Sequence, residues 1–146
     1  MISVEINRSG RLLIISAVGH VLAEEVKQTA GQVRELLQQA APGLHALTDF
    51  RWLESIHPSA APYITEIMGT LAQHHVASIT RIIPDPGKDI GLEMLAQFRY
   101  SAELPISTVE TLVEALDNLA EQDAELGRHQ VRDKMGDKLL RKVTQH

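Results

Sequence analysis

The sequence contains no cysteine, few aromatic residues and no long apolar run. Without cysteine there can be no disulfide, thiol nucleophile or cysteine-bound zinc, and nothing requires an oxidising compartment, so we expect a cytoplasmic protein. Aromatic residues make up 3% of the chain and the net charge is −5, which argues against nucleic-acid binding. No apolar run approaches the ~18 residues of a membrane span, and the start lacks the pattern of a secretion signal.

Standard catalytic and metal-binding motifs are also missing. The chain has no glycine-rich phosphate loop, no G-x-G-x-x-G, no G-x-S-x-G and no H-E-x-x-H. Seven histidines are present, but His74 and His75 are adjacent, and on a helix they would point roughly 100° apart. The sequence therefore favours a protein that is not an enzyme and that holds no metal or cofactor.

The 146 residues, 44% hydrophobic and 23% charged, indicate one globular α/β domain. Strands are expected in a hairpin over residues 1–17 and at 44–50, 76–83 and 104–107, and the apolar run 12–18 indicates a strand covered on both faces. Helices are expected at 23–40, from an N-cap at Ser59 to His74 and His75, at 90–100, and at 108–120 with Thr108 as N-cap. This order, ββαβαβαβα, predicts a single mixed, largely parallel sheet of about five strands with helices packed on it.

The last 26 residues differ in composition from the body of the chain. Residues 1–120 carry a net charge of −6, whereas residues 121–146 carry +1. In this tail Val131, Met135, Leu139 and Val143 recur every four residues, which predicts a C-terminal helical extension with one apolar stripe. Such a helix is too sparse in apolar residues to fold alone, so it packs on the body, frays, or pairs with a second copy. We favour pairing and therefore a homodimer.

Several polar residues fall near the expected carboxyl ends of the strands, where ligand sites of α/β sheets form. His20 and His57 follow two strands, and Asp85 follows a third. These three could line a cleft for a small, apolar molecule, or they could be solvated loop residues. Asp49 ends a strand and caps the loop backbone, unless the protein is an enzyme in which either Asp49 or Asp85 orients His57 as a base.

The segment 50–59 is expected to be a loop with an apolar cluster of Trp52, Leu53 and Ile56. Such a cluster would be costly to expose, so it predicts a protein partner that covers it, although Trp52 could equally cover the core. Ser59 is explained either as a helix N-cap or as a phosphorylation site, because a phosphate is favoured at a helix N-terminus.

The order of elements and the passage LTDFRWLESIHPSAAPYI resemble the STAS-like family, the domain of the bacterial anti-sigma-factor antagonists, over about residues 1–120. In that family a strand ending in a hydrophobic-Asp pair leads to an Asp-Ser-Ser-Gly motif whose second serine is phosphorylated by a partner kinase. Thr48-Asp49-Phe50 resembles the strand end, and residues 57–60 occupy the motif position with only Ser59 retained. VGHVLAEEV resembles the segment that borders the phosphoserine.

The resemblance implies a regulatory domain that binds a protein partner, such as an anti-sigma-factor-type kinase, without catalysing a reaction. The candidate partner or ligand surface then comprises His20, Asp49, Trp52, Leu53, Ile56, His57 and Asp85, with Ser59 as the modified residue. The alternative is a sensor module for a small molecule or lipid, which would bind in a cleft at the carboxyl ends of the strands.

Overall fold

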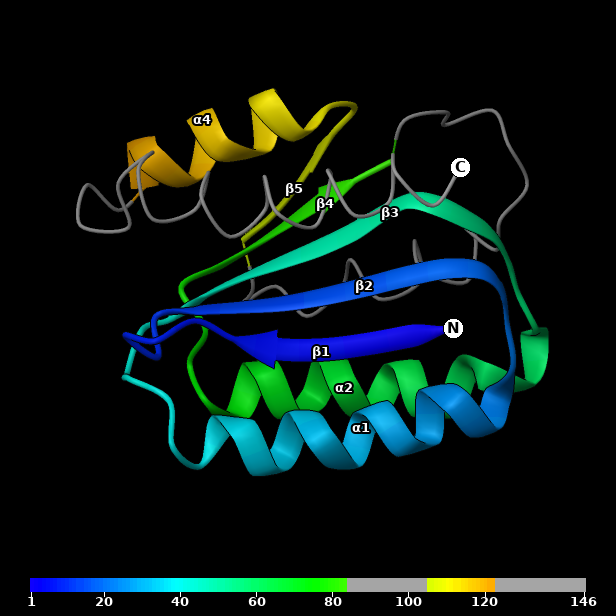
Figure 1. Ribbon diagram of the computed structural model, residues 1–146. Helices are drawn as coiled ribbons and strands as arrows, with labels where there is room; N and C mark the ends of the chain where they lie inside the picture. Colours follow the sequence, from blue (N-terminus) through cyan, green and yellow to red (C-terminus); the bar gives the residue numbers. More distant parts are fainter. Residues whose placement is uncertain (84–104, 123–146) are drawn as a thin grey trace.

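The computed structural model describes residues 1–83 and 105–122 (Figure 1). The elements are β1 (Ile2–Ile6), β2 (Leu12–Val21), α1 (Ala23–Leu37), β3 (His45–Ile56), the short 3₁₀ helix η1 (Pro58–Ala60), α2 (Ala61–Gln73), β4 (Ser78–Ile82), β5 (Ile106–Val109) and α4 (Leu112–Gln122). The helix expected at 90–100, Asp85 and the tail from residue 123 lie outside the described residues.

The five strands form one sheet in the order β1-β2-β3-β4-β5. β1 pairs with β2 antiparallel, and the other three pairings are parallel. Helices α1 and α2 lie together on one face of this sheet and α4 lies on the other (Figure 1). The predicted α/β fold with a single mixed, largely parallel sheet is therefore confirmed.

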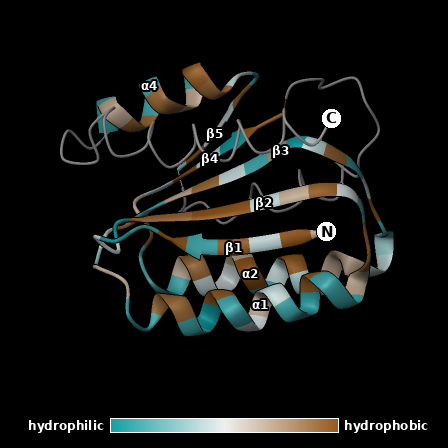
Figure 2. Ribbon diagram, in the orientation of Figure 1, coloured by the Kyte–Doolittle hydropathy of each residue, from teal (hydrophilic) through white to brown (hydrophobic). Residues whose placement is uncertain are grey.

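β2 is apolar on both faces because both faces are covered. Leu13 and Ile15 belong to the larger core against α1 and α2, whereas Leu12 and Ile14 pack with Leu116 and its neighbours on α4. Figure 2 shows β2 as an almost continuous hydrophobic ribbon, whereas the helices carry both hydrophobic and hydrophilic residues. Alternate side chains of a strand point to opposite faces, so a run with no polar side is stable only between two layers.

The helices bury the residues that the 3.6-residue period predicts. The buried side of α1 comprises Val26, Thr29, Ala30, Val33 and Leu37, and that of α2 comprises Ile64, Ile67, Thr70 and Leu71. α1 ends at Leu37, three residues before the predicted limit. α2 ends as predicted, with His74 as C-cap and His75 at φ 53°, a left-handed conformation that stops the helix.

The expectation of a loop at 51–56 is wrong, because β3 continues to Ile56. Ser16 pairs with Asp49 but Val18 pairs with Trp52, and a second shift follows between Gly19 and His20. Each shift places one extra residue on β3, as β-bulges do. The bulges break the alternation of apolar and polar residues, so a period of two could not be read from this segment.

The start of the last described helix was also predicted wrongly. Thr108 is not an N-cap but lies in β5, opposite Arg81 of β4. Thr111 caps α4 instead, since its Oγ1 accepts a hydrogen bond from the Glu114 backbone N–H at 3.2 Å. A threonine followed three residues later by glutamate is the sequence signature of this cap, and Thr111 and Glu114 fit it.

Candidate functional site

The ends of β2 and β3 bring His20 and Ser55 together as register partners. Nδ1 of His20 lies 2.7 Å from Ser55 Oγ, and its Nε2 lies 2.9 Å from a carboxylate oxygen of Glu54. Just after β3, the His57 backbone N–H donates a hydrogen bond at 2.9 Å to the carbonyl of Val21, the last residue of β2. The start of η1 is thereby attached to the junction between β2 and α1.

His57 and Ser59 form a pair on the surface at this junction. The Ser59 backbone N–H donates to His57 Nδ1 at 3.2 Å, and Ser59 Oγ lies 2.7 Å from the same nitrogen. A nitrogen that accepts the backbone N–H carries no proton, so the Ser59 hydroxyl also donates to it. His57, not Ser59, is therefore the capping residue, and the N-cap prediction for Ser59 is wrong. Because the hydroxyl is exposed and its proton faces an imidazole lone pair, Ser59 is chemically accessible.

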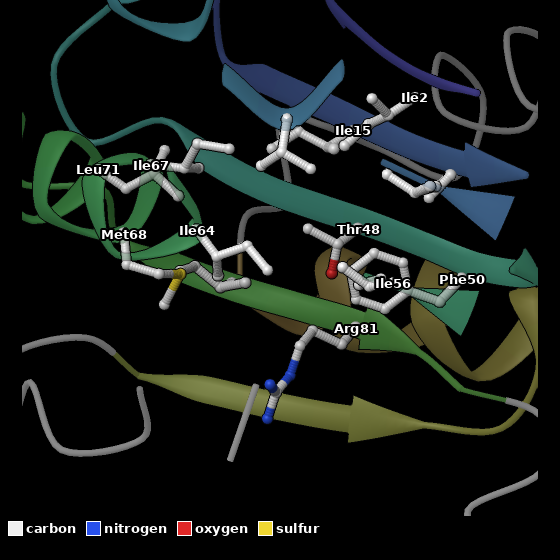
Figure 3. Close-up of a pocket in the computed structure, with 14 residues that line it drawn as sticks. Ile2, Ile15, Thr48, Phe50, Ile56, Ile64, Ile67, Met68, Leu71 and Arg81 are labelled. Atoms are coloured by element: carbon white, nitrogen blue, oxygen red, sulfur yellow. The ribbon is translucent and has the colours of Figure 1, made fainter. Parts of the chain in front are cut away.

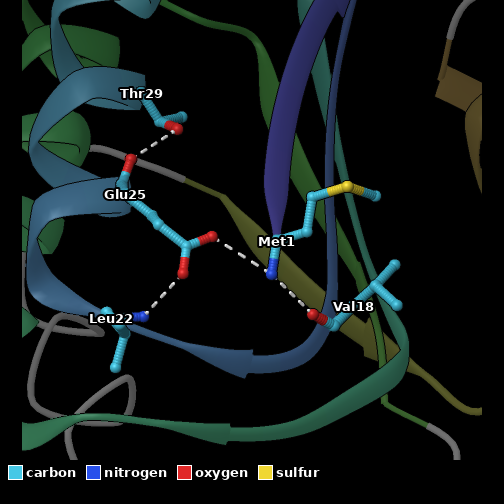
Figure 4. A network of polar contacts seen from close by, with 5 residues as sticks. All are labelled: Met1, Val18, Leu22, Glu25 and Thr29. Atoms are coloured by element: carbon cyan, nitrogen blue, oxygen red, sulfur yellow. Dashed lines mark hydrogen bonds and ion pairs between the residues drawn. The ribbon is translucent and has the colours of Figure 1, made fainter.

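A network of polar contacts fixes the start of α1 (Figure 4). The amino group of Met1 donates to the Val18 carbonyl at 2.8 Å and pairs with Glu25 at 3.1 Å, while the other oxygen of Glu25 accepts from the Leu22 backbone N–H at 3.2 Å. The hydrogen bond from the amino terminus, followed by that from Leu22, lowers the pKa of Glu25.

Two large apolar side chains are exposed at the start of α1. Leu22 is 56% exposed and Met1 67% exposed, and both take part in the network around Glu25. η1, which contains Ser59, is in contact with α1, and Leu22 is the N-cap residue of α1. We call the group His20, Leu22, Ser55, His57 and Ser59 the Ser59 surface.

The structure places the other predicted surface residues differently. Leu53 and Ile56 are buried in the core, so the exposed apolar cluster expected at 52–56 is wrong; Trp52 is half-buried. The bulged end of β3 turns both Leu53 and Phe50 toward the helices, and this orientation is not visible in the local sequence.

Asp49 is buried, with 1% of its surface exposed, and does not line a surface. Its carboxylate accepts from Arg51 Nε at 2.9 Å, from Arg51 Nη2 at 2.8 Å and from the Arg51 backbone N–H at 3.1 Å. The expected backbone cap is thus present, with a bidentate ion pair added to it. No hydrogen bond joins His57 to Asp49 among the described residues, and Asp85, the other candidate partner of His57, lies outside them.

A cavity lies beneath the sheet and reaches the carboxyl ends of β2 and β3, since Val21 and the predicted surface residue Ile56 are among its lining. It opens between the sheet and helices α1 and α2 and has a volume of about 60 Å³ (Figure 3). Its lining is apolar except for Thr48 and Arg81, which sequence reasoning did not single out. A charged residue inside the buried strand SITRI was the only available signal. Neither His20 nor His57 lines this cavity, and Asp85 lies outside the described residues.

Two features are absent from residues 1–83 and 105–122. No three histidine or acidic side chains in these ranges come together in a way that could hold a metal ion. None of the helices there combines the length and the apolar character that crossing a lipid bilayer requires.

The comparisons with known proteins rest on structure. The anti-sigma factor antagonist SpoIIAA in its unphosphorylated form superposes with a TM-score of 0.59 at 18% identity, over 82% of this chain and 97% of that one. The chain has the SpoIIAA-like fold. The phosphorylated form of Bacillus SpoIIAA has a TM-score of 0.56 at 18% identity, over 82% and 99% of the two chains. An uncharacterised SpoIIAA-like protein of Shewanella loihica has a TM-score of 0.56 at 20% identity, over 80% and 91%.

No protein-family model and no curated protein matches the sequence. The fold implied by the resemblance of LTDFRWLESIHPSAAPYI to the STAS-like family is the fold that these solved structures share with the chain. At this level of identity, the likeness concerns the arrangement of helices and strands.

Proposed function

We propose that the protein is a regulatory, non-enzymatic domain of the bacterial cytoplasm that binds a protein partner through the Ser59 surface. The observation that carries the proposal is the exposed Ser59 hydroxyl, held by His57 at 2.7 Å on a short helix that contacts α1, the helix that the exposed Leu22 caps. The structural neighbours support it, because they include an anti-sigma factor antagonist in unphosphorylated and phosphorylated forms.

We further propose that Ser59 is phosphorylated by an anti-sigma-factor-type kinase. In this step the γ-phosphorus of a nucleoside triphosphate forms a bond to Ser59 Oγ, the bond to the diphosphate breaks, and the hydroxyl proton passes to His57 Nδ1. A phosphoserine adds nearly two negative charges at neutral pH, which would alter any apolar contact made by Leu22. An imidazolium at His57 would face this new charge.

Two arguments favour binding over catalysis. A serine–imidazole pair acts as a nucleophile when a third group orients the imidazole, and no such partner of His57 occurs among the described residues. Ser59 and His57 also lie on an exposed surface instead of in the cavity, so a substrate would not be shielded from water there.

Binding of a partner is tested by replacing Leu22 with a photo-crosslinking amino acid in the protein expressed in its own host. Val113 is the matched control, because it is 60% exposed and lies on α4, on the opposite face of the sheet. We expect a discrete crosslinked protein from position 22 that disappears in Ser59→Glu and is not captured from position 113. Equal crosslinking of this protein from both positions would contradict the proposal.

Phosphorylation is tested by mass spectrometry of the protein isolated from the same cells. We expect one phosphoryl group, lost in Ser59→Ala and retained in Ser9→Ala, which removes another exposed serine, in the turn between β1 and β2. A phosphoryl group that persists in Ser59→Ala would exclude Ser59 as the site.

We also propose that the chain is a homodimer that pairs through residues 121–146. α4 continues to Gln122, two residues beyond the expected end of the α/β domain at residue 120, and the Gln122 side chain accepts a hydrogen bond from Ser78 at 2.7 Å. Light scattering should therefore compare the full chain with one ending at Gln122. A dimeric full chain and a monomeric shortened chain would support pairing through the tail. The same number of subunits in both would refute it.

A further inference from the structure

Acidic residues follow one side of α4. Residues 105–122, which contain β5 and α4, have no basic residue and four acidic ones: Glu110, Glu114, Asp117 and Glu121. Each of these lies three or four positions after the one before it, a spacing that places them on one side of the helix and at its start. Asp117 is half-buried and the three glutamates are exposed. This side of the domain therefore presents a row of carboxylates to water.

An apolar strip runs beside the acidic row. Val113 is 60% exposed, and Ala120, two helical turns later, is half-buried. The opposite side of α4 packs on the sheet through Ala115, Leu116 and Leu119. α4 lies on the sheet face opposite α1 and α2, so the strip faces away from the sheet (Figure 1). We call this strip together with the acidic row the outer face of α4.

Two carboxylates of the outer face are free to accept a partner. The side chains of Glu110 and Glu121 make no ion pair or hydrogen bond among the described residues, whereas Glu114 lies 3.2 Å from the Thr111 hydroxyl. Like charges four residues apart on a helix are destabilising. A segment that lays basic side chains along the outer face would relieve this repulsion.

The tail has the complementary pattern in its sequence. Residues 126–146 contain six Lys and Arg and two Asp, so their net charge is +4, against −4 for residues 105–122. Arg132, Lys138 and Lys142 are each adjacent in sequence to a residue of the apolar stripe predicted for the tail. On a helix these basic residues would flank the stripe, as charged residues flank the apolar seam of a coiled coil. An apolar stripe with basic flanks matches an apolar strip with an acidic border.

The two segments also match in length. α4 has 11 residues and is about 17 Å long. The apolar stripe runs from Val131 to Val143, which corresponds to about 20 Å in a helix. One tail is therefore long enough to cover the outer face from end to end.

We propose that the outer face of α4 binds the tail of a second copy of this chain. The stripe over residues 131–143 packs on Val113 and Ala120, and the basic residues beside it pair with Glu110 and Glu121. Each copy gives its tail to the other, so the same contact occurs twice in a symmetric dimer. The inference rests on the proposed homodimer and names the surface that receives the tail.

Charge reversal in the full-length protein tests this assignment, with light scattering over a dilution series as the readout. One variant carries Glu110→Lys and Glu121→Lys on α4, and the other carries Arg132→Glu and Lys142→Glu in the tail. Each variant alone should raise the dissociation constant of the dimer about tenfold or more, because attractive pairs become repulsive in both copies of the contact.

The matched control reverses two carboxylates on the other side of the sheet. Glu24 and Glu35 of α1 are exposed and lie as far apart in sequence as Glu110 and Glu121. Glu24→Lys combined with Glu35→Lys should leave the dissociation constant unchanged. An equal effect of the control and the α4 variant would show that net charge, and not the outer face of α4, governs association.

A mixture of the α4 variant and the tail variant tests whether the tail binds another copy. In a mixed dimer the new lysines on α4 of one copy meet the new glutamates in the tail of the other, and the second contact keeps its original charges. Dimers should therefore return in a one-to-one mixture although each variant alone dimerises weakly. A mixture that dimerises as weakly as its components would show that the tail does not bind a second copy, and the proposal would be wrong.

The same measurements separate this inference from the homodimer on which it rests. A monomeric parent chain refutes the homodimer and the inference with it. A dimeric parent whose dissociation constant is unchanged in the α4 variant refutes only the assignment to the outer face.

Crosslinking provides an independent readout. A photo-crosslinking amino acid at Val113 should join α4 to residues 126–146 of a second copy and give a product with twice the mass of the chain. A crosslink from Val113 to the tail within a single chain would overturn the proposal.

Discussion

The buried ion pair between Asp49 and Arg51 makes a quantitative prediction about stability. Asp49 is 1% exposed and Arg51 is 14% exposed at the side chain, and two hydrogen bonds of 2.8 and 2.9 Å join the carboxylate to the guanidinium. Replacing Asp49 by alanine leaves the guanidinium in a mostly dry environment. Loss of one partner of a buried pair costs about 3–5 kcal/mol, and partial access of Arg51 to water puts the expected cost near the lower end, about 3 kcal/mol.

The assay is urea unfolding followed by far-ultraviolet circular dichroism at neutral pH. A cost of about 3 kcal/mol should lower the midpoint by about 1.5–2 M urea and the melting temperature by about 6–12 °C. Asp49→Asn keeps the shape and removes only the charge, so it should cost less than Asp49→Ala. In a double-mutant cycle with Arg51→Ala we expect a coupling energy of about 2 kcal/mol, which separates this pair from other contacts of Asp49.

An exposed ion pair serves as the control. Arg34 of α1 pairs with Glu66 of α2, with side chains 53% and 38% exposed, so Glu66→Ala should cost less than about 1 kcal/mol. If Asp49→Ala is no more costly than Glu66→Ala, or if the cycle shows no coupling, the reasoning from burial is refuted.

Three further predictions follow from other contacts. Thr48→Val should raise the free energy of unfolding by about 1 kcal/mol in urea titrations, because it removes a buried hydroxyl with no partner among the described residues; a loss of stability would contradict this. Thr111→Ala should lower it by about 1 kcal/mol through loss of the α4 cap, and Thr111→Ser should restore most of it. The lowered pKa of Glu25 adds stability above its ordinary pKa of 4.5 that is lost as the pH falls through the folded value. Between about pH 5 and 3 the unmodified protein should therefore lose more of its free energy of unfolding than Glu25→Gln does. The difference should be less than about 1 kcal/mol, because the Glu25 side chain is one-third exposed. If the free energy of unfolding falls in parallel with pH in the two proteins, the proposed role of the Met1 amino group is refuted.

Local patterns were sufficient to predict most elements of the fold. The apolar run from Leu12 and the four-residue spacing in α1 and α2 report which side of each element is buried, and burial is the main determinant of these elements. The junction at His57 and Ser59 was also predicted as a region of interest, because it directly follows a buried strand. Its hydrogen bonding was not, since Ser59 and His57 are both able to cap.

The sequence by itself determined the α/β class, the strand order along the chain and the exposed position of Ser59, because these depend on periodicity and on turn residues close in the chain. Tertiary structure alone decided the bulges of β3, the burial of Leu53 and the cavity that joins Thr48 to Arg81. Bulges depend on pairing with β2, and the cavity requires residues from β2, β3, β4 and α2 to meet. Such contacts join residues far apart in the chain, so no local pattern encodes them.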